Sequence, residues 1–245
     1  MSFSHSFRGF FSSALAGLPI RCYISQTKGI SAMAPDTPHP QITYFEELKR
    51  KGIHLSSLWM VVAIILIPDW RITAAIFAVL LVITLLFEHA YACNWPVMAP
   101  MYGFFFRKML RKPPAPGAWI VSGGAYVLAA ALLVVILYAP LAAAGALAVM
   151  LTGDAAAALV GRRFGRHKAP NNKSYEGVAA FIVVGAVALS ILFAVTGAPC
   201  KFYFAGYLAL FPAAAAELFE KQLRLDDNFS IPLIVGLALQ LAFLL

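Results

Sequence analysis

Residues 141–160 are LAAAGALAVMLTGDAAAALV, an apolar run that a single carboxylate, Asp154, interrupts. A helix that crosses a bilayer needs roughly 20 consecutive apolar residues, so this stretch predicts a transmembrane helix. Its repeated alanine and glycine predict close contact with neighbouring helices, because small side chains let backbones approach. An ionised group in such a span costs at least roughly 2.5–3.5 kcal/mol, which favours a functional role for Asp154 over a purely structural ion pair.

The rest of the chain has the same apolar character. Of its 245 residues, 61% are hydrophobic and 12% are charged, against about 45–50% and about 25% in an average soluble domain. The excess apolar surface has to face lipid, so we expect an all-α polytopic integral membrane protein with about seven transmembrane helices. The predicted spans are 53–67, 72–90, 119–138, 141–160, 177–197, 202–219 and 229–245.

The basic residues indicate the orientation. Of the 19 Lys and Arg, all except Arg71 and Lys201 fall on one side of the seven predicted spans. The positive-inside rule makes that side cytosolic, and both a bacterial cytoplasmic membrane and an organellar or ER membrane fit. The net charge of +8 comes without a nucleic-acid-binding module, so we expect the lipid bilayer and nucleotides as partners and no nucleic acid.

The first 43 residues form a separate N-terminal tail. Residues 1–40 hold seven serines, three basic residues and one acid, Asp36. This composition is compatible with a transit peptide, with a disordered tail, or with a true start at Met33. The predicted membrane domain is 44–245.

A basic loop follows the run at 141–160. It contains six potential cations and two glycines, which are Arg162, Arg163, Arg166, His167, Lys168, Lys173, Gly161 and Gly165. Cations beside glycines that permit close approach are what a polyphosphate needs, and Asn172 or Ser174 is expected to cap the next helix. The spacing is not that of a Walker A loop. The alternative is a loop that binds only lipid headgroups.

Three motifs carry a family resemblance. The first is Gly153-Asp154, then Gly161-Arg162-Arg163-Phe164-Gly165, then Lys173-Ser174-x-Glu176-Gly177. The second is Glu46/Glu47 with Arg50-Lys51 and His54, which resembles an E-x-x-R-K-x-x-H pattern. The third is Asp226-Asp227-Asn228-Phe229-Ser230-Ile231-Pro232-Leu233, with Glu217 upstream.

Over residues 44–245 these motifs resemble the membrane lipid kinases, the family of dolichol kinase, phytol kinase and CTP-dependent diacylglycerol kinase. The first motif is shared with CDP-diacylglycerol synthases. The Asp-Asp-Asn motif, and the lack of the synthases' C-terminal signature, favour the kinases. Two alternatives stay open, a CDP-lipid synthase (phosphatidate cytidylyltransferase) and a non-enzymatic membrane protein that binds or transports anions.

The resemblance implies phosphoryl transfer from CTP, or another nucleoside triphosphate, to a lipid alcohol such as phytol, a polyprenol, dolichol or diacylglycerol. The implied catalytic residues are Asp154, Lys173 and His54, and either Asp154 or His54 would orient the acceptor hydroxyl. The implied nucleotide-binding residues are Arg50, Lys51, Gly161, Arg162, Arg163, Gly165, Lys168, Ser174 and Glu176. The implied Mg²⁺ ligands are Asp154, Asp226 and Asp227.

Structural roles compete with some of these assignments. Arg50 and Lys51 border a predicted span, where basic side chains commonly reach along the helix to the membrane surface. Asp226 and Asp227 would serve equally well as the start of the last helix, with Asn228 as its N-cap.

Overall fold

The computed structural model describes residues 44–93, 95–97, 100–101, 103, 121–169, 171, 173–223 and 225–244. The predicted tail over 1–43 lies outside these residues. The chain divides into two compact units, one of Tyr44–Leu85 with Val121–Leu245 and the other of Met1–Thr43 with Leu86–Ile120. In the second unit the described residues include the end of helix α4 (Trp70–Ala92). The rings of His89 and Trp95 lie edge to face there, with 6.4 Å between their centroids. Every candidate site residue belongs to the first unit.

The described residues are mostly helical and contain no β-strand, only an isolated β-bridge between Lys168 and Ser174. This confirms the predicted all-α class. Besides α4, the helices are α2 (Tyr44–Ser56), α3 (Trp59–Leu66), α6 (Gly123–Leu137), α7 (Pro140–Phe164), α8 (Tyr175–Thr196), α9 (Cys200–Leu218), α10 (Glu220–Leu223) and α11 (Asp227–Leu241).

Among the described residues, three helices are long and apolar enough to cross a membrane: α4, α7 and α8. Helices α6 and α11 are apolar but have 15 residues each, fewer than the roughly 20 that a bilayer needs. The predicted span 53–67 is not one continuous helix, because α2 ends at Ser56 and α3 begins at Trp59. The three helices are compatible with a membrane protein, and the count of seven spans stays a prediction.

Helix α7 forms the centre of the first unit. It packs against α2, α3, α6, α8 and α11, and its residues from Ala142 to Leu151 are buried. A Cβ added at Gly145 would lie 2.6 Å from Leu239 on α11, and one added at Gly153 would lie 2.8 Å from the Phe181 ring on α8. A side chain at Gly145 would have to displace the end of Leu239, and one at Gly153 the Phe181 ring, so the glycines let the helices approach closely. The predicted close packing of 141–160 is confirmed.

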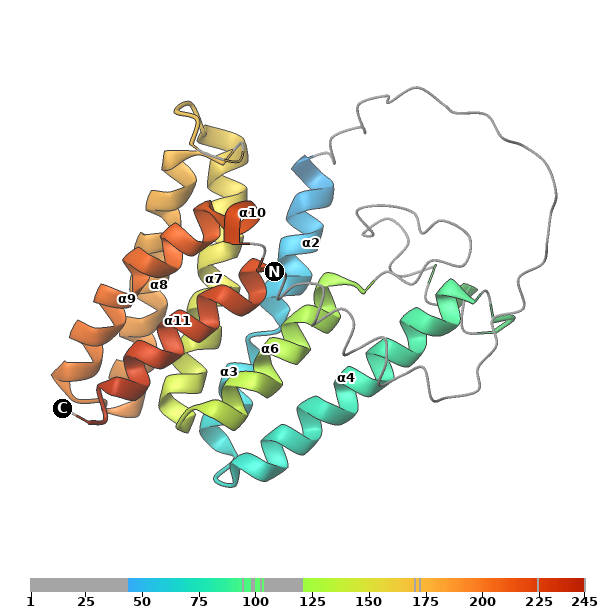
Figure 1. Cartoon of the computed structure of the whole chain (residues 1–245), viewed down its shortest axis with the longest axis horizontal. Coiled ribbons are helices and arrows are strands. Elements are labelled where there is room, and N and C mark those ends of the chain that lie inside the picture. The colour runs from blue at the N-terminus through green and yellow to red at the C-terminus, as the bar shows by residue number, and fades with distance from the viewer. Residues whose placement is uncertain are drawn as a thin grey trace. The chain divides into compact units, whose positions relative to one another are not determined.

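The polar ends of the helices gather at one end of this unit. In Figure 1 the start of α2, the end of α7 and the start of α8 lie at the top of the view, and α10 lies beside them. The α3–α4, α6–α7 and α8–α9 turns lie at the bottom. Arg71 and Lys201 are the two basic residues predicted to lie on the side opposite to all the others. They occupy the first turns of α4 and α9, at that lower end.

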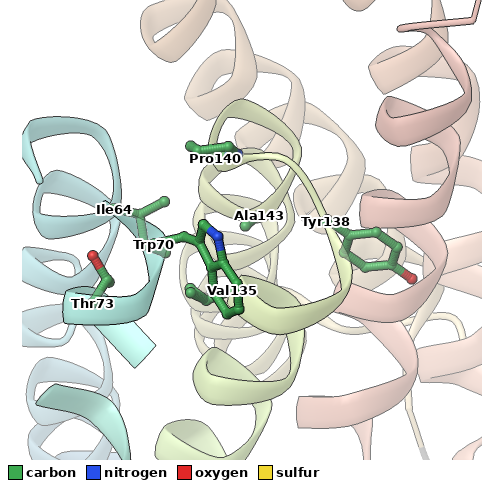
Figure 2. Close-up of a pocket in the computed structure, with 7 residues that line it drawn as sticks. All are labelled: Ile64, Trp70, Thr73, Val135, Tyr138, Pro140 and Ala143. Atoms are coloured by element: carbon green, nitrogen blue, oxygen red, sulfur yellow. The ribbon is translucent and has the colours of Figure 1, made fainter. Parts of the chain in front are cut away.

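A small apolar pocket lies at the opposite end from the basic loop. Figure 2 shows its lining residues, which are Ile64, Trp70, Thr73, Val135, Tyr138, Pro140 and Ala143. Ala143 precedes Asp154 on α7 by eleven residues, about 17 Å along the helix. The pocket is therefore separate from the charged residues that the sequence selects.

Candidate functional site

One face of helix α2 carries polar side chains toward α7. Four residues stand three or four positions apart, Glu47, Arg50, Lys51 and His54. At 3.6 residues per turn this spacing places them on one side of a helix. That side packs against α7, where Asp154 lies ten residues before the helix ends.

The ammonium group of Lys51 contacts Asp154 inside the protein. Its Nζ lies 2.5 Å from Asp154 Oδ2, and the two side chains are 4% and 12% exposed. His54 Nε2 lies 3.4 Å from the same oxygen; it is buried and has no hydrogen-bond partner in the described part of the chain. The structure thus brings together two predicted catalytic residues, Asp154 and His54, and one predicted nucleotide ligand, Lys51.

Glu47 connects α2 to the end of α7. Its carboxylate accepts hydrogen bonds from both Nε and Nη2 of Arg50, the Nε contact at 3.3 Å, and lies 3.8 Å from Nη2 of Arg162. Burial alone would raise the pKa of Glu47, but the hydrogen bond from Arg50 and the nearby positive charges outweigh it and lower that pKa. Burial likewise opposes the charge of Arg50, and Glu47 raises the pKa of Arg50. The sequence motif contained Glu47, but no role was assigned to it.

Lys173 belongs to a second cluster, at the end of α9. Its Nζ lies 2.5 Å from the backbone oxygen of Glu217 and 3.3 Å from Oε1 of the same residue. Glu220 Oε2 lies 3.6 Å from the ammonium. The other carboxylate oxygen of Glu217, Oε2, is buried without a hydrogen-bond partner among the described residues. Lys173 therefore lies between two carboxylates.

Glu220, Asp226 and Asp227 form an acidic group at the junction of α10 and α11. One carboxylate oxygen from each lies within 4.8 Å of the others. Burial, with the charges of Asp154, Asp226 and Glu220, raises the pKa of Asp227 to about 8. Asp226 caps α11 by accepting a hydrogen bond from the backbone nitrogen of Asn228 at 3.0 Å. The expectation that Asn228 is the cap was therefore wrong, and Glu220 joins the acidic group without having been predicted.

The three predicted Mg²⁺ ligands lie in different clusters. Asp154 contacts Lys51, whereas Asp226 and Asp227 lie beside Glu220. Asp154 still contributes to the raised pKa of Asp227, and Asp227 contributes to the raised pKa of Arg50. The charges of the two clusters therefore influence one another.

The loop between α7 and α8 is held by its own polar contacts. Ser174 caps α8 by accepting from the Gly177 backbone nitrogen at 3.1 Å, as one of the two alternatives predicted; Asn172 lies outside the described residues. Glu176 Oε1 lies 3.1 Å from the backbone nitrogen of His167 and 2.7 Å from its ring Nδ1. Asn171, in a left-handed conformation with φ 60°, donates to the Leu218 carbonyl at 2.7 Å. Ser174 and Glu176 therefore shape this loop.

The loop glycines have a packing role. A Cβ added at Gly161 would lie 2.9 Å from Ser174 Oγ, and one at Gly165 would lie 2.2 Å from the Gly161 carbonyl oxygen. Both are closer than ordinary contacts, so a side chain at either position would displace the junction between α7 and α8. Arg163 and Lys168, also assigned to the nucleotide by the resemblance, are exposed and make no ion pair in the described residues.

Comparison with known proteins finds a relative that is similar over most of this chain. The uncharacterized protein RP860 of Rickettsia prowazekii (strain Madrid E) is 27% identical to this chain over 195 residues, covering 76% of this chain and 90% of that protein. No family model matches the chain, and no solved structure matches it. The similarity extends over most of both proteins, and the relative's name assigns no activity.

Proposed function

We propose that this chain is a membrane-embedded lipid kinase that transfers the γ-phosphoryl group of CTP, or of another nucleoside triphosphate, to a lipid alcohol. Phytol, a polyprenol, dolichol and diacylglycerol are the proposed acceptor classes. The observation that carries the proposal is the buried contact of Lys51, Asp154 and His54, next to cations that can hold phosphates. The motifs on these residues resemble the lipid kinase family.

The acceptor would be bound at Asp154 and His54. Asp154 Oδ2 and His54 Nε2 are 3.4 Å apart, and the buried Nε2 lacks a hydrogen bond in the described part of the chain. A substrate hydroxyl could donate its hydrogen to one of these acceptors, which would then take the proton. The hydroxyl oxygen would form a bond to the γ-phosphorus while the bond to the β–γ bridging oxygen breaks, releasing CDP when CTP is the donor. Because the site is buried among apolar helices, an acceptor that enters from lipid is favoured over a soluble one.

The nucleotide phosphates would contact Arg50, Arg162 and Lys173. Phosphoryl transfer depends mainly on positioning and on stabilising charge, and a guanidinium group can bind phosphate through two parallel hydrogen bonds. Glu47 holds Arg50 and lies close to Arg162, so both guanidinium groups are positioned before the phosphates arrive. Lys51 would stabilise the anionic form of Asp154 and act beside the transferred group.

A divalent cation is needed to balance charge. In the two clusters the carboxyl groups outnumber the lysines and arginines, and the raised pKa of Asp227 shows that burial and its neighbours oppose a further negative charge there; a cation that replaces the proton would let the phosphates approach. The carboxyl groups are Glu47, Asp154, Glu217, Glu220, Asp226 and Asp227, and the cations are Arg50, Lys51, Arg162 and Lys173.

The acidic group of Glu220, Asp226 and Asp227 fits Mg²⁺, because its three oxygens lie within 4.8 Å of one another and Mg²⁺ prefers oxygen ligands. When bound, Mg²⁺ would neutralise and orient the phosphates.

The proposal includes the membrane arrangement. We infer about seven crossings and a catalytic side that faces the cytosol. A bacterial cytoplasmic membrane, or an ER or organellar one, would contain the protein. Asn171 of the basic loop donates to the Leu218 carbonyl and to Gln222 on α10, and Glu220 on α10 lies beside Asp226 and Asp227, which supports a single site on one side.

A transfer assay tests this function. Purified protein in liposomes that contain phytol, polyprenols and diacylglycerol is incubated with Mg²⁺ and γ-labelled CTP, ATP or UTP. We expect labelled lipid from at least one nucleotide, with CTP the best donor, and none from the double variant Lys51→Met/Asp154→Asn. Folded wild-type protein that labels no lipid with any of the three nucleotides would overturn the proposal.

A further inference from the structure

The cations around the α7–α8 loop divide into an inner and an outer set. Arg162 and Lys173 face carboxylates, at 3.8 Å from Glu47 and 3.3 Å from Glu217 respectively. Three others are exposed and have no carboxylate within 4.0 Å among the described residues: Arg163, Arg166 and Lys168. The inner cations lie near carboxylates, whereas the outer three face no carboxylate in the described part of the chain and can bind an anionic partner.

Exposed aromatic rings accompany the outer cations. Phe164, the last residue of α7, is 60% exposed, and Tyr175, the first residue of α8, is 56% exposed. The Arg163 guanidinium lies 5.8 Å from the Phe164 ring centroid and 5.9 Å from that of Tyr44 on α2. Together, Arg163, Phe164, Arg166, Lys168 and Tyr175 are termed the outer basic surface below.

The position of this surface selects its partner. Helices α7 and α8 are both candidate membrane spans, and they meet at this loop, so the proposed membrane arrangement places the surface where two spans leave the bilayer. Aromatic side chains with one apolar face are enriched at that depth, and Lys and Arg extend from it toward headgroups. An exposed phenylalanine beside cations that face no carboxylate among the described residues suits a boundary of hydrocarbon and phosphate, because a water-soluble nucleotide would leave that ring in water.

We propose that the outer basic surface binds the phosphate headgroups of anionic phospholipids, with Phe164 and Tyr175 placed at the edge of the hydrocarbon. This inference rests on the proposed membrane arrangement of α7 and α8. The basic loop then has two functions. Arg162 and Lys173 bind the nucleotide phosphates, and the outer cations Arg163, Arg166 and Lys168 bind the anionic bilayer surface.

The test compares lipid selectivity with nucleotide binding in the same protein. Full-length protein is reconstituted in phosphatidylcholine bilayers with trace spin-labelled phosphatidylglycerol or spin-labelled phosphatidylcholine, and the motionally restricted fraction of each gives their relative association. Wild type should select phosphatidylglycerol. In Arg163→Gln/Arg166→Gln/Lys168→Gln that selectivity should fall at least about fivefold, the effect of roughly one basic residue near an anionic surface.

The matched variant is Arg162→Gln, which removes an inner cation of the same loop. It should weaken binding of fluorescent CTP and keep the selectivity for phosphatidylglycerol, whereas the triple variant should do the reverse. Charge-conserving Arg163→Lys/Arg166→Lys should retain selectivity and show that the loop still folds. Unchanged lipid selectivity in the triple variant, or a loss of CTP binding as large as that of Arg162→Gln, would overturn the inference. If wild type binds no nucleotide, the proposed kinase function fails, while the lipid measurement still decides the outer surface.

Discussion

The contact between Lys51 and Asp154 predicts an effect of mutation on folding stability that could not be predicted from the sequence alone. The sequence indicates that Asp154→Asn should leave folding intact and only abolish activity. In the structure, however, the Asp154 carboxylate is 2.5 Å from a lysine that is 4% exposed. Removing one partner of a buried ion pair leaves the other charge without compensation and typically costs about 3–5 kcal/mol. Asp154→Asn and Lys51→Met should therefore both destabilise the fold.

The size of this effect can be measured by thermal unfolding. In a protein of this length each kcal/mol shifts the midpoint by about 2–4 °C, so each single variant should unfold about 6–20 °C below wild type. The double variant Lys51→Met/Asp154→Asn should recover most of that loss, because it removes both charges and its new amide can donate to His54 Nε2. Lys49→Met, an exposed lysine on the same helix, is the matched control and should change stability by less than about 0.5 kcal/mol.

Circular dichroism in detergent micelles gives the midpoints, and γ-label transfer gives the activity. Both single variants and the double variant should be inactive. The reasoning is refuted if Asp154→Asn unfolds within about 2 °C of wild type, or if the losses of the two single variants add in the double variant instead of cancelling.

Three further predictions concern the remaining charged residues. Glu47→Gln should weaken CTP binding about tenfold or more by releasing arginine side chains, since a hydrogen bond to a charged group contributes about 1.5–3 kcal/mol; a fluorescent CTP titration with Asp69→Asn, an exposed carboxylate before α4, as the control checks this, and equal effects of both changes would count against it. Asp227→Asn should weaken Mn²⁺ binding on the order of tenfold, followed by electron paramagnetic resonance without nucleotide. Lys173→Gln should instead tighten Mn²⁺ binding by about tenfold, because it removes a cation 3.6 Å from Glu220; weaker binding would show that Lys173 does not compete with the metal.

The residues at the site were predictable because their surroundings are unusual. Asp154 is a carboxylate within an apolar run, and Lys51 and His54 share a helical face with Arg50 in a short motif. Their contact was not predictable, since Lys51 and Asp154 are 103 positions apart in the sequence. Only the packing of α2 on α7 brings them together.

Other features were missed because the local sequence carries no distinct signal. Glu220 lies in a short polar segment between α9 and α11, where a carboxylate is expected at the surface, and only the fold places it beside Asp226. The break after Ser56 was missed because no proline or glycine marks it. The glycines at 161 and 165 were assigned to phosphate approach, whereas the structure shows contacts with Ser174 and the α7 backbone that require them for packing.

The central claim is that the γ-phosphoryl group, and not the nucleotide, is transferred to lipid. The direct measurement follows CTP labelled at the γ position and, separately, at the α position, with liposomes that contain lipid alcohols and phosphatidic acid. A lipid kinase places γ-label on the lipid and leaves α-label in released CDP. Appearance of α-label in the lipid, with release of pyrophosphate, would instead identify a CDP-lipid synthase and contradict the account.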